Sequence, residues 1–316
     1  MAYRLKGKRV WIAGHGGMVG SALARRLARE GCEVLTIDRA RLDLTRQADV
    51  EDYVGQTRPD GVIVAAARVG GIAANADRPV AFLAENLQIA TNIVAASHAC
   101  GVERLLYLGS SCIYPRNAPQ PIAEFALLEG ALEPTNQWYA IAKIAGLKLV
   151  QAYRREFGRD YIAALPTNLY GPGDNFDLDT GHVLPALIHR AHLAKKSGHP
   201  ALTVWGSGRP MREFLHVNDC ADALTLLFRR WSDDAPVNIG SNQEIAIAEL
   251  ARLVCDTVGY DGDIRFDPSR PDGTPRKRLD TAKLDALGWR PSIGLADGIA
   301  DTYRWFLDHH DLGRAA

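Results

Sequence analysis

Four side chains near the middle of this 316-residue sequence could carry out proton transfer. They lie in the motifs SSCIY, over residues 110–114, and YAIAK, over residues 139–143. Tyr139 and Lys143 are four residues apart, so they would share one face of a helix. A protonated Lys143 would stabilise the phenolate of Tyr139 and lower its pKa, and the hydroxyl of Ser110 can hydrogen-bond the same substrate oxygen. This chemistry interconverts a carbonyl and an alcohol.

The thiol of Cys112 is not needed for a plain reduction. A free cysteine taken alone is most often a small buried apolar residue. A thiolate and an imidazolium, however, can remove and return protons on carbons beside a ketone. His182, at the start of an apolar helix pattern, is the candidate partner. The sequence therefore suggests a second proton-transfer step, while its spacing alone leaves open whether Cys112 and His182 meet.

A dinucleotide site is predicted from a glycine-rich turn between a strand pattern and a helix pattern. Its residues are Gly14, His15, Gly16, Gly17, Met18, Val19 and Gly20. Glycines permit a tight turn and close ligand approach, and the helix N-terminus directs backbone N–H groups at a pyrophosphate. Asp38 and Arg39 end the next strand and indicate opposite cofactors, since an acid bonds a ribose and a base accommodates a 2′-phosphate. Asp43 could instead meet the adenine edge.

The elements that position these residues alternate between strand and helix over the first half of the chain. Strand patterns cover residues 8–13, 33–37, 61–66, 104–109 and 161–165, and helix patterns cover 21–30, 49–56, 79–100 and 136–157. Such alternation implies parallel strands joined by right-handed crossovers. We therefore expect an α/β fold with a doubly wound (Rossmann) parallel sheet over residues 1–170. The serine motif then follows a strand at its carboxyl end, where such sheets bind ligands.

Residues 171–316 predict a smaller C-terminal α/β substrate-binding lobe, with some of the chain crossing back. Short strand patterns at 202–205, 237–239 and 263–266 mix there with helix patterns at 219–231 and 247–258. The stretch 205–214 places two arginines and an aromatic residue in a predicted glycine loop, and 272–277 repeats the theme with an acid first. Arginine suits phosphate recognition, and tryptophan suits base or sugar stacking.

Composition favours a small-molecule partner. The chain is 47% hydrophobic, and its 37 Lys and Arg balance 37 Asp and Glu, so no net charge argues for nucleic acid or a membrane surface. The 5 cysteines show no paired spacing, which argues against a metal site and for a reducing compartment. Apolar runs are too short to span a bilayer, and no signal peptide is evident. We expect a cytoplasmic protein.

Several longer stretches resemble the extended short-chain dehydrogenase/reductase family. They are GHGGMVG (14–20), LGSSCIYP (108–115), EPTN (133–136), YAIAKIAG (139–146), PTNLYGP (166–172), PMREFLHV (210–217) and PDGTPRK (271–277). Within that family the sequence is similar, nearly end to end, to the epimerase-reductases of GDP-4-keto-6-deoxymannose. The resemblance implies that Cys112 as base and His182 as acid invert carbons 3 and 5. It further implies that NADPH reduces carbon 4 while Tyr139, supported by Lys143 and Ser110, donates the proton.

The same resemblance implies further binding residues. The cofactor side comprises Leu44, Leu108, Gly109, Ser111, Pro166, Thr167, Asn168 and Leu169, and the GDP-sugar side comprises Arg190, Trp205, Arg212 and Asp272. Relatives often carry an arginine for the 2′-phosphate at the position of Gly16, and this chain lacks it. Arg39 remains as the other base on the phosphate side, although Asp38 beside it would repel the phosphate, so NADP is expected and NAD stays open. A homodimer through helices 79–100 and 136–157 is implied by analogy.

Two other classes of function stay in view. A single-function nucleotide-sugar 4-epimerase or 4,6-dehydratase would share the scaffold, but a dehydratase is expected to carry an acidic pair after the serine, where this chain has Ser111-Cys112-Ile113. A non-enzymatic dinucleotide sensor is expected to lose the tyrosine or the lysine, and both are present. The dual epimerase-reductase is the favoured hypothesis.

Overall fold

A six-stranded parallel sheet forms the centre of the larger lobe. The computed structural model of the chain describes residues 2–309. The sheet consists of β2 (Glu33–Leu35), β1 (Arg9–Ala13), β3 (Gly61–Val64), β4 (Arg104–Leu108), β5 (Asp160–Pro166) and β9 (Val237–Ile239), in that spatial order. The chain leaves β1 for β2 and then returns to β3 on the other side of β1. This change of direction opens a crevice at the carboxyl ends of β1 and β3, where doubly wound sheets bind ligands. The predicted Rossmann-type fold is confirmed.

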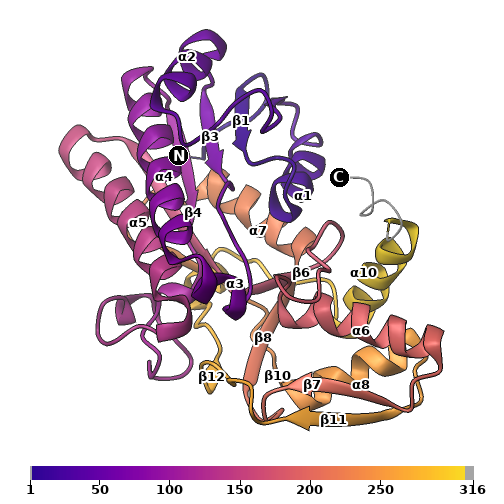
Figure 1. The fold of residues 1–316 in the computed structure, drawn as a ribbon. Helices are drawn as coiled ribbons and strands as arrows, with labels where there is room; N and C mark the ends of the chain where they lie inside the picture. The colour runs from indigo at the N-terminus through magenta and orange to yellow at the C-terminus, as the bar shows by residue number, and fades with distance from the viewer. Residues whose placement is uncertain (1, 310–316) are drawn as a thin grey trace.

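Helices cover both faces of this sheet because its strands are apolar on both sides. One face packs against α2 (Gln47–Thr57), α4 (Pro79–Ala99) and α5 (Gln137–Phe157), and the other against α1 (Met18–Leu27) and α7 (Val217–Arg230) (Figure 1). Alternate residues of one strand serve the two cores: Trp11 is buried in the first and Ile12 in the second.

The smaller lobe is built on β8 (Met211–His216). Beside it lie β6 (Asn168–Tyr170), β10 (Glu244–Ala246) and β12 (Arg276–Lys277), and β7 (Ala201–Trp205) pairs separately with β11 (Asp263–Asp267). A third apolar core joins this lobe to α6 (Val183–Ser197), α8 (Ile247–Val258) and α10 (Leu295–His309). Between β8 and β10 the chain returns through α7 and β9 to the larger lobe. The short helices α3 (Ile72–Asp77) and α9 (Ala282–Ala286) complete the described helices longer than one turn.

The predicted loop over residues 205–214 is wrong in its second half. Gly206 and Gly208 have positive φ and do form a turn, but the chain is extended from Met211, where β8 begins. Arg212 is therefore held on a strand. Its strand partners, β10 and β12, lie far away in the sequence, so local composition did not reveal the pairing.

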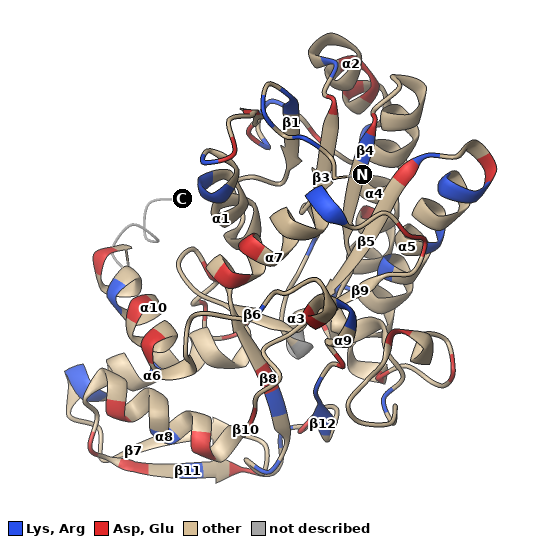
Figure 2. Ribbon diagram, turned by 180° about the vertical axis from the view of Figure 1, so that it is seen from behind, with Lys and Arg blue, Asp and Glu red and all other residues tan. Residues whose placement is uncertain are grey.

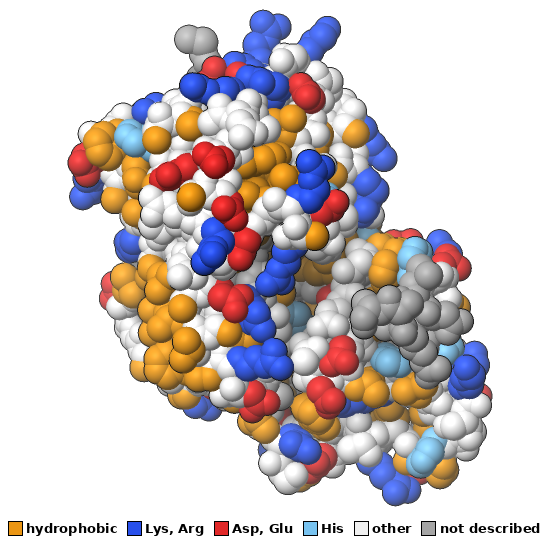
Figure 3. Space-filling model, turned by 45° about the horizontal axis from the view of Figure 1, so that its top comes forward, with side chains coloured by type: hydrophobic (Ala, Val, Ile, Leu, Met, Phe, Trp, Pro, Cys, Tyr) orange, Lys and Arg blue, Asp and Glu red, His pale blue; other side chains and the backbone are white. Residues whose placement is uncertain are grey.

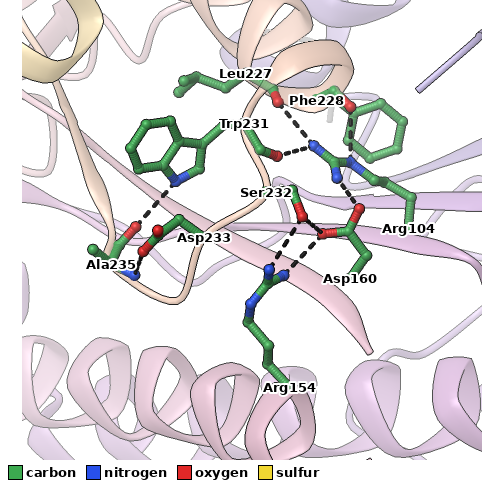
Figure 4. Close-up of polar contacts among 9 residues, drawn as sticks. All are labelled: Arg104, Arg154, Asp160, Leu227, Phe228, Trp231, Ser232, Asp233 and Ala235. Atoms are coloured by element: carbon green, nitrogen blue, oxygen red, sulfur yellow. Dashed lines mark hydrogen bonds and ion pairs between the residues drawn. The ribbon is translucent and has the colours of Figure 1, made fainter. Parts of the chain in front are cut away.

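A buried guanidinium joins the sheet to the end of α7 at the edge opposite the crevice. The side chain of Arg104 is only 2% exposed; it pairs with Asp160 and donates to the carbonyl oxygen of Phe228 over 2.8 Å (Figure 4). Arg154 and Ser232 also hydrogen-bond Asp160, over 2.8 and 2.7 Å. A buried charge needs such complete pairing, so this network is structural.

The remaining charges are spread over both lobes, with Lys and Arg interspersed among Asp and Glu (Figure 2). A furrow separates the lobes in the space-filling view, and basic side chains stand along its edge (Figure 3). Within residues 2–309, no helix has both the length and the apolar character needed to cross a membrane.

Candidate active site

The glycine-rich turn forms a backbone cradle at the end of β1. Gly14 has φ +93°, and a Cβ there would lie 2.7 Å from the Cα of Ala66. A Cβ on Gly20 would collide with the carbonyl oxygen of Gly14. Helix α1 begins at Met18 with neither a side-chain cap nor an acidic residue in its first turn, so its N–H groups are available to an anion. These features fit the pyrophosphate of a dinucleotide.

The residues after β2 lie in the open. Asp38 and Arg39 are exposed, and the Nε2 atom of His15 is 3.4 Å from a carboxylate oxygen of Asp38. The carboxylate of Asp43 accepts hydrogen bonds from the amide and the hydroxyl of Thr45, which lowers the pKa of Asp43. Asp43 therefore also stabilises its own turn. A Cβ on Gly16 would meet nothing within 4 Å, so this side of the turn is roomy.

The predicted proton-transfer residues come together at the carboxyl end of β4. Ser110 follows the strand, and its hydroxyl accepts a 3.2 Å hydrogen bond from the amide of Cys112. It also hydrogen-bonds the phenol of Tyr139, which stands in the first turn of α5. Hydroxyl, phenol and thiol thus share one neighbourhood, as the spacing of the two motifs suggested for the first two.

Lys143 points to the strand rather than to the phenol. Its Nζ donates a 2.7 Å hydrogen bond to the carbonyl oxygen of Leu108 and lies 4.9 Å from the ring centre of Tyr107 and 5.9 Å from that of Tyr139. The side chain is 3% exposed, and this burial lowers the pKa of Lys143 to about 7. The ammonium is therefore easily deprotonated.

The expected lowering of the Tyr139 pKa is wrong for this structure. Burial raises the pKa of Tyr139, and the charge of Cys112 adds to the rise, while the hydrogen bond with Ser110 opposes it. Lys143 makes no resolved contribution, because it is itself buried and engaged with Leu108. The phenol is therefore protonated near neutral pH, as a proton donor must be.

The thiol of Cys112 faces a cation that we did not single out from the sequence. The Nζ atom of Lys277 lies 3.4 Å from Sγ and is its hydrogen-bond donor. Burial acts to raise the pKa of Cys112, but the charges of Lys277 and Arg212 and the hydrogen bonds from Ser110 and Lys277 outweigh it, and the pKa is lowered. The stretch PDGTPRK contains Lys277, yet nothing local connects it to residue 112.

His182 lies at the N-cap position of α6 and is exposed to solvent. Although the residue is exposed in part, neighbouring protein atoms desolvate the imidazole ring, which lowers the pKa of His182, and the positive charge of Lys277 lowers this pKa further. The positive charge of Lys277 therefore lowers the pKa of both members of the predicted acid-base pair, Cys112 and His182.

The residues expected on the GDP-sugar side form two groups. Arg190 stacks its guanidinium 4.6 Å from the ring centre of Trp205, and Arg270, which sequence reasoning missed, lies 4.8 Å from the same ring. Arg212 donates to the backbone oxygen of Asp272 over 3.1 Å. The carboxylate of Asp272 is itself engaged with the amide and hydroxyl of Ser207, both at 2.7 Å.

The remaining predicted cofactor residues line the strand ends and their connections. Gly109 follows β4 closely packed, since a Cβ there would collide with Leu165. Ser111 and Thr167 are buried, and the side-chain amide of Asn168 donates to the backbone oxygen of Glu213 over 2.8 Å. The other members of this group are Leu44, Leu108, Pro166 and Leu169, of which Leu44 lies apart, beyond β2, where its carbonyl accepts from Asn92. Among residues 2–309 no group of three or more His, Cys, Asp or Glu side chains could hold a metal ion.

Comparison with known proteins agrees with this geometry. Residues 10–240 match the NAD dependent epimerase/dehydratase family. The GDP-L-fucose synthase of Sinorhizobium fredii is 55% identical over 307 residues, which cover 97% of this chain and 98% of the relative.

Solved structures give the same result. A GDP-L-fucose synthetase from Naegleria fowleri bound to NADP superimposes with a TM-score of 0.90 at 27% identity, covering 98% of this chain and 97% of the other. A GDP-6-OMe-4-keto-L-xylo-heptose reductase from C. jejuni gives a TM-score of 0.91 at 31% identity, covering 98% and 100%. The resemblance seen in the sequence motifs is confirmed, and this chain belongs to the NAD dependent epimerase/dehydratase family.

Proposed function

We propose that this chain converts GDP-4-keto-6-deoxymannose into GDP-L-fucose by inverting carbons 3 and 5 and reducing carbon 4 with NADPH. The observation that carries the proposal is the juxtaposition of a thiol and a phenol. The backbone amide of Cys112 and the phenol of Tyr139 both hydrogen-bond the hydroxyl of Ser110, and the charge of Cys112 raises the pKa of Tyr139. A reductase alone needs the phenol; an epimerase step beside a ketone needs a second base.

The chain's own residues supply the proton transfers. The thiolate of Cys112 removes a proton from a carbon next to the ketone, so the C–H bond breaks, an S–H bond forms and the electron pair enters an enolate. The imidazolium form of His182 then gives a proton to the opposite face of that carbon, so an N–H bond breaks, a C–H bond forms with the electron pair of the enolate, and a neutral imidazole remains. NADPH, when bound, supplies the hydride for carbon 4. Tyr139 then gives its phenolic proton to the oxygen on that carbon, held by Ser110.

The smaller lobe, over residues 171–316 apart from α7 and β9, is proposed to bind the nucleotide. Arg190 and Arg270 around Trp205 offer two guanidiniums and an aromatic face near one another. Guanidiniums form paired hydrogen bonds to phosphates, and a tryptophan ring stacks on bases. A nucleoside diphosphate carries both groups.

The decisive experiment follows the label. The chain is incubated with GDP-4-keto-6-deoxymannose and NADPH in D₂O, and the product is examined by NMR. GDP-L-fucose carrying deuterium at carbons 3 and 5 is the expected product. A sugar reduced at carbon 4 without label at the other two carbons would instead identify a single-function reductase on a related deoxysugar. The observation in support of this alternative is the similarity to the heptose reductase.

NADP is proposed over NAD, because Arg39 is exposed and directly follows Asp38, whose carboxylate reaches His15 of the glycine-rich turn, and a guanidinium at this position can pair with a 2′-phosphate. The negative charge of Asp38 would repel a 2′-phosphate, but the imidazole of His15 lies 3.4 Å from this carboxylate and can hydrogen-bond it. Steady-state turnover with NADPH and NADH decides the matter. A clear preference for NADH contradicts this choice.

A homodimer is proposed through α4 and α5, which pack against one another on one side of the sheet. Their outer surface exposes apolar side chains, among them Val80 (76%), Trp138 (38%) and Ile141 (41%). Two such helices from each copy would bury this face in a four-helix arrangement. Sedimentation of the parent and of Ile141→Glu tests it, with a dimer expected for the parent and a monomer for the variant. A cytoplasmic location is also proposed, since all the cysteines are free thiols.

A further inference from the structure

Lys277 is an ammonium in a place where a lone charge is costly. Its residue is only 8% exposed. Among the described residues no carboxylate forms an ion pair with it, and the sulfur of Cys112, at 3.4 Å, is the hydrogen-bond partner of Nζ. A buried cation is stable only when it is paired. Glu133 lines the same pocket, but its carboxylate forms its ion pair with Arg116, over 3.2 Å, so the group in direct contact with Nζ that can provide a negative charge is the thiol.

The backbone fixes this ammonium against the sulfur from one side. Lys277 is the register partner of Arg212 on the neighbouring parallel strand β8, so both side chains leave the sheet toward the same face. Residue 279, just beyond, is tied to β8 by a 2.9 Å hydrogen bond from its amide to the buried carboxylate of Glu213. Both cations are thus held near Cys112.

Residues 120 and 122, in the segment that follows Cys112, hold the strand of Lys277 from the other side. Gln120 donates to the backbone oxygen of Arg276 over 3.1 Å and accepts from the amide of Arg278 over 2.9 Å. The amide of Ile122 donates to the oxygen of Arg278 over 2.8 Å. Hydrogen bonds to the backbone of both neighbouring residues therefore fix the strand position from which the Lys277 side chain reaches the sulfur.

We propose that Lys277 is a positioning residue for the epimerase step: its ammonium holds Cys112 as a thiolate and directs the sulfur at the carbon to be deprotonated. The role in epimerisation rests on the proposed function. When the thiolate takes a proton, the S–H bond forms at the expense of the C–H bond, and Lys277 keeps its own protons and charge. The positive charge of Lys277 also favours loss of a proton from the imidazolium of His182, which is the step in which His182 protonates carbon.

Other charged groups near the thiol act with Lys277 or against it. Arg212 on β8 lowers the pKa of Cys112, as Lys277 does. The negative charge of the thiolate raises the pKa of Tyr139 on α5. Glu133, which lines the same small pocket and is 6% exposed, offsets part of the charge of Arg212. Lys277 is the charged group that makes direct contact with Sγ, and its removal should have the largest effect.

The test measures the thiol directly and needs no substrate. The alkylation rate of Cys112 by iodoacetamide is followed from pH 5 to 10 by peptide mass spectrometry, in the parent, Lys277→Met, Lys277→Arg and Arg276→Met. The Met variant at 277 is expected to have a midpoint at least one pH unit higher, so that its rate at pH 7 is lower by about tenfold or more. Lys277→Arg should retain a low midpoint.

Arg276→Met is the matched control, because Arg276 is the neighbouring cation on β12 but is exposed and paired with Glu244. Its midpoint should equal that of the parent. A Lys277→Met variant with an unchanged midpoint and a native circular dichroism spectrum overturns the proposal. Should that variant not fold, the parent alone decides: a Cys112 midpoint at or above about 8.5, the value of a free thiol, also overturns it.

These outcomes separate the two proposals. A raised midpoint in Lys277→Met, together with no label at carbons 3 and 5 in the product of the parent, would support the ion pair and contradict the proposed function. Full labelling by the parent, together with an unchanged midpoint in Lys277→Met, would support the function and remove Lys277 from the mechanism.

Discussion

The Nζ atom of Lys143 donates a 2.7 Å hydrogen bond to the carbonyl oxygen of Leu108. This bond ties the first turns of α5 to the last residue of β4 and thereby sets the position of Tyr139, one helical turn earlier. It also holds a titratable group in a place where its charged form is poorly solvated. Burial lowers the pKa of Lys143 to about 7. The lysine therefore positions the site at a cost in stability that depends on pH.

We predict that Lys143→Met makes the chain more stable relative to the parent at pH 6.5 than at pH 9, by roughly 2 kcal/mol. The unfolded lysine keeps its ordinary pKa of about 10.4. Between about 7 and that value the unfolded chain binds more protons, so the free energy of unfolding of the parent rises with pH in this window, and below it the full cost of the buried charge is present. The methionine variant lacks this dependence.

Urea unfolding at the two pH values measures the difference. Lys148→Met is the control, since Lys148 lies on the same helix and is exposed. The control should differ from its parent equally at both pH values. An offset for Lys143→Met that is the same at pH 6.5 and pH 9 contradicts the prediction.

Tyr139→Phe should separate the two halves of the reaction. The phenol is protonated at neutral pH because burial raises the pKa of Tyr139, and in the proposed reaction it gives this proton to the ketone oxygen. Without it, carbon 4 cannot be reduced at a normal rate, and we expect a loss of about 10²-fold or more in cofactor oxidation. Label from D₂O should still enter carbons 3 and 5, because Cys112 and His182 are untouched. Unchanged cofactor oxidation would refute the role of the phenol.

Local patterns were enough to predict the elements of the larger lobe and the placement of Tyr139 and Lys143 on one helix, α5. They failed where the deciding contact spans a long stretch of sequence. The thiol of Cys112 and the ammonium of Lys277 are 165 residues apart, and Arg212 lies on a strand whose partners are distant. The pKa of Tyr139 could not be predicted either, because the burial that raises it and the hydrogen bond that draws Lys143 to Leu108 exist only in the folded chain.

Cys112→Ser should produce the opposite pattern to Tyr139→Phe. A serine hydroxyl remains protonated beside Lys277 and cannot act as a base at neutral pH. We expect incorporation of deuterium at carbons 3 and 5 to fall by at least about 10²-fold, while an already epimerised ketone is still reduced. NMR of the sugar after incubation in D₂O gives the first quantity, and cofactor absorbance gives the second. Equal labelling in the variant and the parent would exclude the thiol.

Substitutions in the glycine turn should sort by the room around each Cα. Gly20→Ala places a methyl group against the carbonyl oxygen of Gly14, so the turn must distort, and we expect weaker NADPH binding and a loss of about 1–3 kcal/mol in stability. Gly16→Ala, the matched control, meets open space and should change stability by less than about 0.5 kcal/mol.

The same open space allows a gain of function at Gly16. Gly16→Arg should raise the preference for NADPH over NADH, because a guanidinium there can reach a 2′-phosphate together with Arg39. The ratio of kcat/KM for the two cofactors measures this preference, and about a tenfold rise corresponds to one added charged hydrogen bond of about 1.4 kcal/mol. If the ratio stays the same while Gly20→Ala weakens binding of both cofactors, the turn holds the pyrophosphate but the 2′-phosphate lies elsewhere, and Arg39 loses its assigned role.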